Sequence, residues 1–191
     1  MVNYFVLLIL ISALWIFRRP NGSAKRFLRP LLIFSALVIF SFLIYFSIEQ
    51  YRDWSQSELT KLLLPPYRGI GYFIFYVGYV FFAPYLVSLA TALIFLFAAK
   101  YLNKKFQERF FEREEPYLGA LAIFLVGYPL CFFYLITMFS FYLIVHLGLL
   151  IFNRDSSSRI SMYYLWLPLA IFAIIIAEWF QIFPVWNLLK I

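Results

Sequence analysis

The residues of this sequence that could carry out catalysis are Cys131, the single cysteine, His146, the single histidine, and the pair Glu114 and Glu115. A thiol touching an imidazole forms a nucleophile and its base, whereas two carboxylates beside a histidine can hold a metal ion or activate water. Cys131 and His146, however, are about four helical turns apart within one apolar run. Neither has a second cysteine or histidine at the spacing of metal ligands. We therefore expect no catalytic residue, no metal site and no cofactor, and we keep an intramembrane enzyme, in which the four residues converge, only as the third hypothesis.

Two interruptions by glycine and proline indicate a different chemistry, the binding of a transported solute. Gly78 precedes Pro84 in one apolar run, and Gly127 directly precedes Tyr128 and Pro129 in another. Interrupted hydrophobic segments at corresponding places are the usual sign of a binding site in transporters. An imidazole inside a membrane also marks a functional site by default, although it can instead stay neutral and hydrogen-bond a nearby hydroxyl. If the chain carries a solute, the expected substrate-binding residues are Pro84, Ser88, Tyr128, Pro129 and His146.

These residues are positioned by apolar segments, the longest of which covers residues 117–152 without an aspartate, glutamate, lysine or arginine. A spanning helix needs about 20 apolar residues, so this segment exceeds one crossing. Gly127 and Pro129 offer a place to break it. Either a helix over about 129–152 crosses after a partial segment, or both halves cross as a pair. A dozen helical residues reach only about 18 Å, which favours the first reading.

The composition places the chain in a membrane. Hydrophobic residues make up 65% of it and charged residues 13%, whereas soluble domains average about half apolar and a quarter charged. The net charge of +7 could indicate nucleic-acid binding, but the basic residues are confined to short segments between apolar runs, as the positive-inside rule describes. We predict a single transmembrane domain over residues 1–191, with the lipid bilayer as its partner and no nucleic acid.

An all-α polytopic bundle follows, and its crossings are expected at about 2–17, 30–48, 70–99, 129–152 and 160–177. The first should be a retained span, because its basic residues follow the apolar run rather than precede it. The loop 18–29 carries only basic charges and is predicted to be cytoplasmic, as is the loop 100–116. Five crossings put the N-terminus outside and the C-terminus inside, whereas six, with both halves of 117–152 crossing, put both outside.

Short interfacial amphipathic helices are expected in two connecting segments. Ser55 and Glu58 have the spacing of a capping box, and Pro65 would end the helix that starts there. In the segment 100–116, Phe106 and Phe110 recur at helical spacing among charged residues, which predicts an amphipathic helix resting on the membrane surface.

The order of elements from Pro65 to Ala173 follows a family pattern. It consists of LLPP, a long run ending in FAAKYLNKKF, then YLGALAIFLVGYPL, and HLGLLIFNRDSSSRIS before a last span. In this order the chain resembles the Yip-domain family of polytopic membrane proteins. The resemblance implies a five-span helical bundle without catalysis that acts in membrane organisation or trafficking.

The leading hypothesis is a non-enzymatic integral membrane protein that organises the membrane or partner proteins. The runner-up is a small transporter or channel component whose site lies near the breaks at Pro84 and Pro129. The interior separates the two, because a scaffold should be dry and packed with aromatic rings, whereas a transporter should hold a polar cavity at mid-membrane depth. Either protein could bind a membrane-protein partner or form a homo-oligomer.

Overall fold

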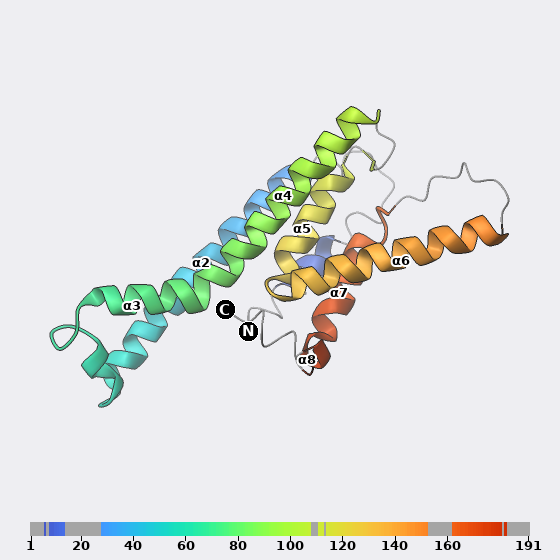
Figure 1. The fold of residues 1–191 in the computed structure, drawn as a ribbon. Helices are drawn as coiled ribbons and strands as arrows, with labels where there is room; N and C mark the ends of the chain where they lie inside the picture. Colours follow the sequence, from blue (N-terminus) through green and yellow to red (C-terminus); the bar gives the residue numbers. More distant parts are fainter. Residues whose placement is uncertain are drawn as a thin grey trace.

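The computed structural model describes residues 6, 8–13, 28–107, 111–112, 114–152, 162–180 and 182, and every regular element in these ranges is helical (Figure 1). The predicted all-α class is confirmed. Three helices are long and apolar enough to cross a membrane, namely Leu28–Gln56, Ile70–Lys105 and Leu130–Leu149. These three match predicted crossings, but they do not by themselves give five or six. The first predicted span, 2–17, lies largely outside the described residues, although 8–13 are helical.

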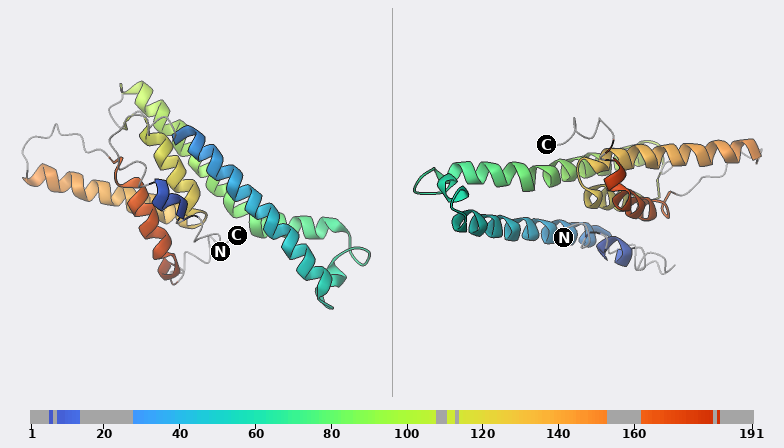
Figure 2. Two further views of the ribbon diagram at one scale, coloured as in Figure 1. Left: turned by 180° about the vertical axis from the view of Figure 1, so that it is seen from behind. Right: turned by 90° about the horizontal axis from the view of Figure 1, so that it is seen from below.

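The two longest helices form an antiparallel hairpin (Figures 1 and 2). Its first arm is α2 (Leu28–Gln56). The second arm is continuous from α3 (Ile70–Val77) through a π-helical turn, η3 (Gly78–Phe82), into α4 (Ala83–Lys105). Pro84 is the second residue after the π turn and occupies the first turn of α4. The predicted crossing over 70–99 is therefore part of one continuous helical arm, Ile70–Lys105.

The interfacial helix predicted to start at Ser55 and end at Pro65 does not start there in the structure. α2 continues past the expected end at residue 48 to Gln56, because polar side chains do not prevent helical hydrogen bonding once the chain leaves the apolar layer. The hydroxyl of Ser55 donates to the carbonyl of Arg52 inside α2 instead of capping a new helix. A short 3-10 helix, η2 (Thr60–Leu63), precedes Pro65. The predicted stop is thus correct and the predicted capping box is wrong.

The second predicted interfacial helix, over 100–116, is also wrong in the described residues. Its first part is the end of α4, which closes at Lys105. The backbone then enters the left-handed region at Gln107, where φ is 52°. Residues 111, 112 and 114 are not helical, and the next helix, α5 (Glu115–Val126), starts at Glu115. Lysines at the end of α4 interact favourably with the negative end of its dipole, so the helix extends through them to Lys105.

α5 ends inside the longest apolar run. Pro116 lies in its first turn, which a helix tolerates. The helix stops at Gly127, whose φ of 79° is a conformation that glycine adopts readily. Pro129 follows, and α6 (Leu130–Phe152) begins immediately after it. The break predicted at Gly127 and Pro129 is confirmed, and α5 spans only about 18 Å from end to end.

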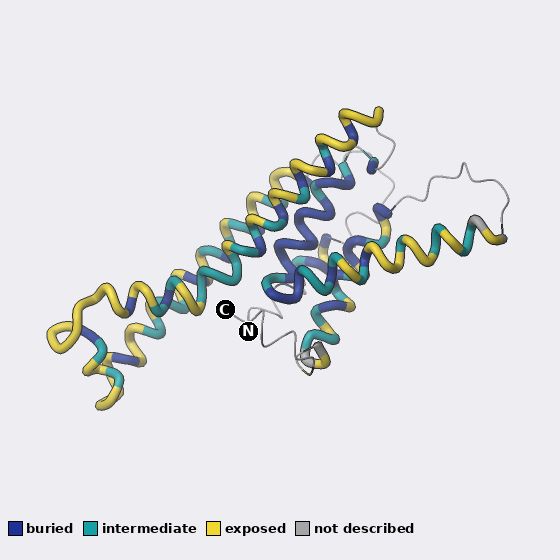
Figure 3. The backbone as a smooth tube through the Cα atoms, in the orientation of Figure 1, coloured by how far each residue is buried: buried dark blue, intermediate teal, exposed yellow. Residues whose placement is uncertain are grey.

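α5 is the centre of the bundle (Figure 3). All of its residues except Tyr117 are buried. It packs most extensively against α4 and then against α7 (Trp166–Ile175), with α2 and α6 covering the rest. Because α5 is apolar on every side, it can only be stable when it is enclosed in this way. A short helix, α8 (Ala177–Phe180), follows α7.

The long helices are mostly exposed where they leave α5. In α6, the buried residues are confined to the first half, and no residue from Phe139 to Leu149 is buried (Figure 3). Large apolar side chains, such as Ile144 and Ile151, lie on this exposed part. Such surface is stable in lipid and not in water, which agrees with a membrane protein. The last predicted span, 160–177, contains the shorter helix α7, which begins only at Trp166.

Candidate functional site

Buried polar groups gather at the N-terminal end of α5. Glu115, the first residue of that helix, is 1% exposed. Its carboxylate accepts a hydrogen bond from the indole nitrogen of Trp166 at 3.1 Å and another from the backbone nitrogen of Glu112 at 2.8 Å. Trp166 is the first residue of α7, and its carbonyl accepts a hydrogen bond from Tyr134 of α6 at 2.8 Å. A buried carboxylate thus ties the starts of two helices together.

Asn103 fixes the connection between α4 and α5. Its side-chain nitrogen donates to the carbonyl of Phe111 at 2.8 Å, and its oxygen accepts from the backbone nitrogen of Phe111 at 2.9 Å. The amide is buried, so these bonds replace the water that the two backbone groups would otherwise need. The ring of Phe111 also meets Phe95 of α4 edge-on. The chain is therefore held against α4 before α5 begins.

Two basic side chains converge on Tyr117, one turn into α5. Lys100 of α4 donates a hydrogen bond from Nζ to the phenolic oxygen at 2.7 Å, and its Nζ lies 4.1 Å from the ring centroid. The guanidinium carbon of Arg29, in the first turn of α2, lies 5.5 Å from the same centroid. We call these three residues the cationic site. Three helices contribute one residue each, so its geometry depends on the packing of α2 and α4 around α5.

The cationic site is electropositive. Burial of the phenol raises the pKa of Tyr117, but the hydrogen bond and charge of Lys100, together with the charge of Arg29, outweigh it and bring the pKa below its ordinary value. In the described part of the chain, no carboxylate forms an ion pair with either basic group. Within the described ranges, the site therefore carries two positive charges that no carboxylate neutralises.

Four of the predicted substrate-binding residues lie around the opposite end of α5. Ser88 of α4 is fully buried, and its hydroxyl is within hydrogen-bond distance of the carbonyls of Ile123 and Phe124, at 3.0 and 3.1 Å. These carbonyls belong to the last turn of α5, which has no helical donors. Pro84 precedes Ser88 by about one turn. Tyr128 and Pro129 form the turn that follows α5. The single proton of this hydroxyl thus serves two of the carbonyls at the helix end, which ties α4 to α5 there.

His146 is separate from that group. It lies in the outer half of α6, about 24 Å along the helix from Leu130. Its imidazole stacks on the ring of Tyr142, one turn earlier, with centroids 5.9 Å apart and planes 7° from parallel. Half-buried against its own helix, it is not brought to the breaks at Pro84 and Pro129.

The residues of the enzyme hypothesis also stay apart. Glu115 and Cys131 lie near opposite ends of α5, since the backbone nitrogen of Cys131 bonds to the carbonyl of Gly127 just past that helix. This places their backbones about 18 Å apart along the axis of α5. His146 follows Cys131 by about 22 Å of helix. Catalytic groups work at hydrogen-bond distance or through one water, so this set is not assembled. No cluster of metal-ligating side chains occurs among the described residues.

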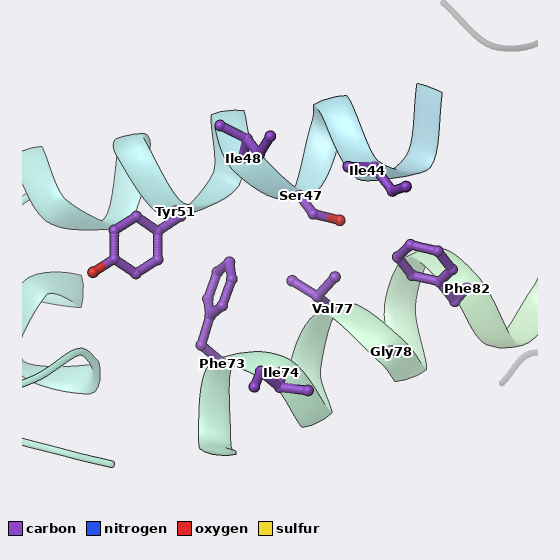
Figure 4. A pocket seen from close by; sticks show the side chains of 9 residues that line it. All are labelled: Ile44, Ser47, Ile48, Tyr51, Phe73, Ile74, Val77, Gly78 and Phe82. Carbon is purple, nitrogen blue, oxygen red and sulfur yellow. The ribbon is translucent and has the colours of Figure 1, made fainter. Parts of the chain in front are cut away.

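An apolar groove of about 440 Å³ lies between α2 and the second arm of the hairpin (Figure 4). Ile44, Ile48 and Tyr51 face it from α2, and Phe73 and Val77 face it from α3. The hydroxyl of Ser47 also lines it but already donates to the carbonyl of Leu43 at 2.6 Å. The lining is almost wholly apolar, so a hydrocarbon chain would fit its chemistry better than a polar solute.

Comparison with protein-family models, with curated proteins and with solved structures gives no match. Sequence reasoning singled out Glu115 only as a catalytic candidate, and it missed Arg29, Lys100, Tyr117 and Asn103. The available signal was positional, because Arg29 and Lys100 are the basic residues next to two apolar runs. Their meeting at Tyr117 depends on packing that no local pattern contains.

Proposed function

We propose that this chain is a non-enzymatic integral membrane protein that organises the surrounding bilayer or partner proteins. The observation that carries the proposal is the closed, apolar interior around α5. Its residues from Leu118 to Val126 are buried without exception. Aromatic rings complete the packing, including Phe95 and Trp166 with centroids 5.1 Å apart. An interior of this kind favours an organising role, because it makes a rigid body for lipid or protein to pack against.

The groove between α2 and α3 supports the lipid side of the proposal. It is apolar, and exposed apolar residues such as Ile74 border it. Lipid acyl chains share this chemistry, so they fill such a groove without desolvating a polar group. The resemblance to the Yip-domain family, with its non-catalytic role in membrane organisation, points to the same function.

We also propose five crossings, with the ends of the hairpin that carry Arg29 and Lys100 in the cytoplasm. Three crossings are the long helices, and the other two are the segments 2–17 and 160–177. The test replaces Cys131 with alanine and places one cysteine at a time by Asn153→Cys or Ile191→Cys. Five crossings require an impermeant thiol reagent to label Asn153→Cys from outside and Ile191→Cys only from inside. Six crossings would reverse the two results, with Ile191→Cys labelled from outside and Asn153→Cys only from inside.

Reconstitution in sealed vesicles tests the proposed function. The full chain should change the size distribution of vesicles in proportion to the protein-to-lipid ratio, and it should leave ion gradients and trapped small solutes in place. The Ser88→Ala variant, whose packing at the end of α5 should be looser, serves as the control that shows how much leakage loose packing alone produces. Saturable flux of any solute through the wild-type protein would overturn the proposal, and so would vesicles that look the same with and without protein.

A small transporter or channel component is the second candidate. The observation in its favour is the end of α5 at Gly127, within an apolar run, where its last turn contacts Ser88 of the neighbouring arm, about one turn after Pro84. Interrupted helices of this type form the sites of known transporter folds. The vesicle experiment decides between the two candidates, because only a transporter gives flux. Flux that disappears in Ser88→Ala would further locate the path at this end of α5.

A further inference from the structure

Two positive charges from separate helices share one aromatic ring at the cationic site, and this arrangement needs an explanation. Arg29 and Lys100 both lie within 5.5 Å of the centroid of Tyr117. Like charges held this close repel one another. A phenol offers partial compensation through its ring and its oxygen, but it carries no full negative charge when protonated. A bound anion would complete the site.

The buried carboxylate at the start of α5 has partners outside the cationic site. Glu115 precedes Tyr117 by two residues, but its carboxylate points to Trp166 of α7 and to the backbone of Glu112. Arg29 is exposed and Lys100 is half-buried, so an outside ligand can reach both. Lys100 has three donors and spends one on Tyr117, and the guanidinium of Arg29 has five. The site therefore keeps unused donors of the type that phosphate oxygens prefer.

The position of the site selects the kind of phosphate. Arg29 stands at the start of α2 and Lys100 is followed by Lys104 and Lys105 at the end of α4. Both are the ends of helices long enough to span a membrane, which is the depth of lipid headgroups. Basic pockets between spanning helices bind anionic headgroups in this way. We propose that Arg29 and Lys100, meeting at Tyr117, bind the headgroup phosphate of an anionic phospholipid.

This inference rests on the proposed function, since it names a lipid that the protein would organise. It is tested on the purified full chain in a neutral detergent. Phosphatidylglycerol should raise the thermal unfolding midpoint in a saturable manner, whereas phosphatidylcholine and inorganic phosphate should not. Arg29→Gln and Lys100→Gln should each raise the apparent Kd for phosphatidylglycerol about tenfold or more. Lys104→Gln, an exposed lysine on the same helix end, removes the same charge and should leave the Kd within about twofold.

Several outcomes would overturn the inference. If phosphatidylcholine raised the unfolding midpoint as much as phosphatidylglycerol does, the site would not distinguish the charge of the headgroup. If inorganic phosphate raised it equally, free phosphate would be the ligand. Equal losses in Lys104→Gln and Lys100→Gln would show that only the overall charge matters. If a glutamine variant does not fold, Arg29→Lys and Lys100→Arg, which keep the charge, should retain the shift, and its absence would also overturn the inference. If the protein changes vesicle size but phosphatidylglycerol does not raise its unfolding midpoint, the inference fails while the proposed function stands.

Discussion

The carboxylate of Glu115 and the indole nitrogen of Trp166 lie 3.1 Å apart, and each residue is the first of its helix. The contact joins positions 51 residues apart in sequence. Both side chains are almost fully buried. A charged acceptor placed at the positive end of α5 also favours the helix dipole. This hydrogen bond therefore adds a directional contact to the packing of the two short helices.

A double-mutant cycle on Glu115→Ala and Trp166→Phe should give a coupling energy of about 1 to 2 kcal/mol. The cycle cancels the other contacts that each residue makes. The free energy of unfolding of the four proteins, measured by chemical unfolding in mixed micelles, provides the value. Trp179 of α8 is 75% exposed, so Trp179→Phe serves as the control and should not couple to Glu115→Ala. A cycle that closes at zero for Trp166 would contradict the assigned role.

Ser88→Ala should lower the free energy of unfolding by about 1 to 3 kcal/mol, because it leaves buried carbonyls of α5 without a donor. The matched control is Ser41→Ala. Ser41 is exposed and its hydroxyl donates only to Leu37 of its own helix, so its loss should cost little. Thermal unfolding of both variants in one detergent checks the prediction. Equal midpoints would mean that the end of α5 does not depend on Ser88.

Gly119→Ala should destabilise the protein by about 1 to 3 kcal/mol through overpacking. A methyl group there would lie 2.6 Å from Cε1 of Phe95 and 3.1 Å from the indole of Trp166. Gly148 of α6 has open space around it, so Gly148→Ala should be neutral or stabilising by up to about 1 kcal/mol through helix propensity. The unfolding midpoint of Gly119→Ala should fall below that of the wild type, and the midpoint of Gly148→Ala should stay the same or rise. A stable Gly119→Ala variant would show that α5 has room beside α4.

Asn103→Asp should cost about 2 kcal/mol or more, because it removes the donor to the carbonyl of Phe111 and places negative charge against that carbonyl. Gln107 is exposed, so Gln107→Glu makes the same change of charge nearby without a buried partner. Chemical unfolding at neutral pH measures both. Lowering the pH until the new carboxylate is protonated should recover part of the loss in Asn103→Asp only. Equal stability of the two variants would remove Asn103 from the packing of this connection.

The sequence predicted the features that depend on local chemistry. Hydropathy located the long apolar helices, and Gly127 and Pro129 located the end of α5, because an interrupted hydrogen-bond pattern is a property of those residues themselves. The two predictions of interfacial helices were wrong because they also relied on hydropathy alone. Hydropathy marks the edge of the apolar layer and not the edge of a helix, so the helical extension of α2 to Gln56 was assigned to a new element.

The candidate site depends on distant contacts, and these were not predictable from local pattern. Glu115 was noticed for its charge, but its partner Trp166 lies in another helix. Ser88 was expected to bind a solute because it lies near a proline break, whereas the structure gives it the carbonyls of α5 as partners. Arg29 and Lys100 read as ordinary flanking charges until α2, α4 and α5 are packed together. Tertiary packing, which a single sequence does not contain, decides these roles.

The π-helical turn at Gly78–Phe82 gives the second arm of the hairpin two working faces. A π turn holds one residue more than an α turn, so the side chains that follow it are rotated by about 100° relative to those before it. Before the turn, Phe73 and Val77 pack with Trp54 of α2 in a small satellite core, and after it Ala92 and Leu96 belong to the main core around α5. One continuous helix can therefore pack into two separate cores on different sides. Deleting a single residue from this turn would rotate the side chains of one part by about 100° relative to the other, so both cores could no longer be filled at once.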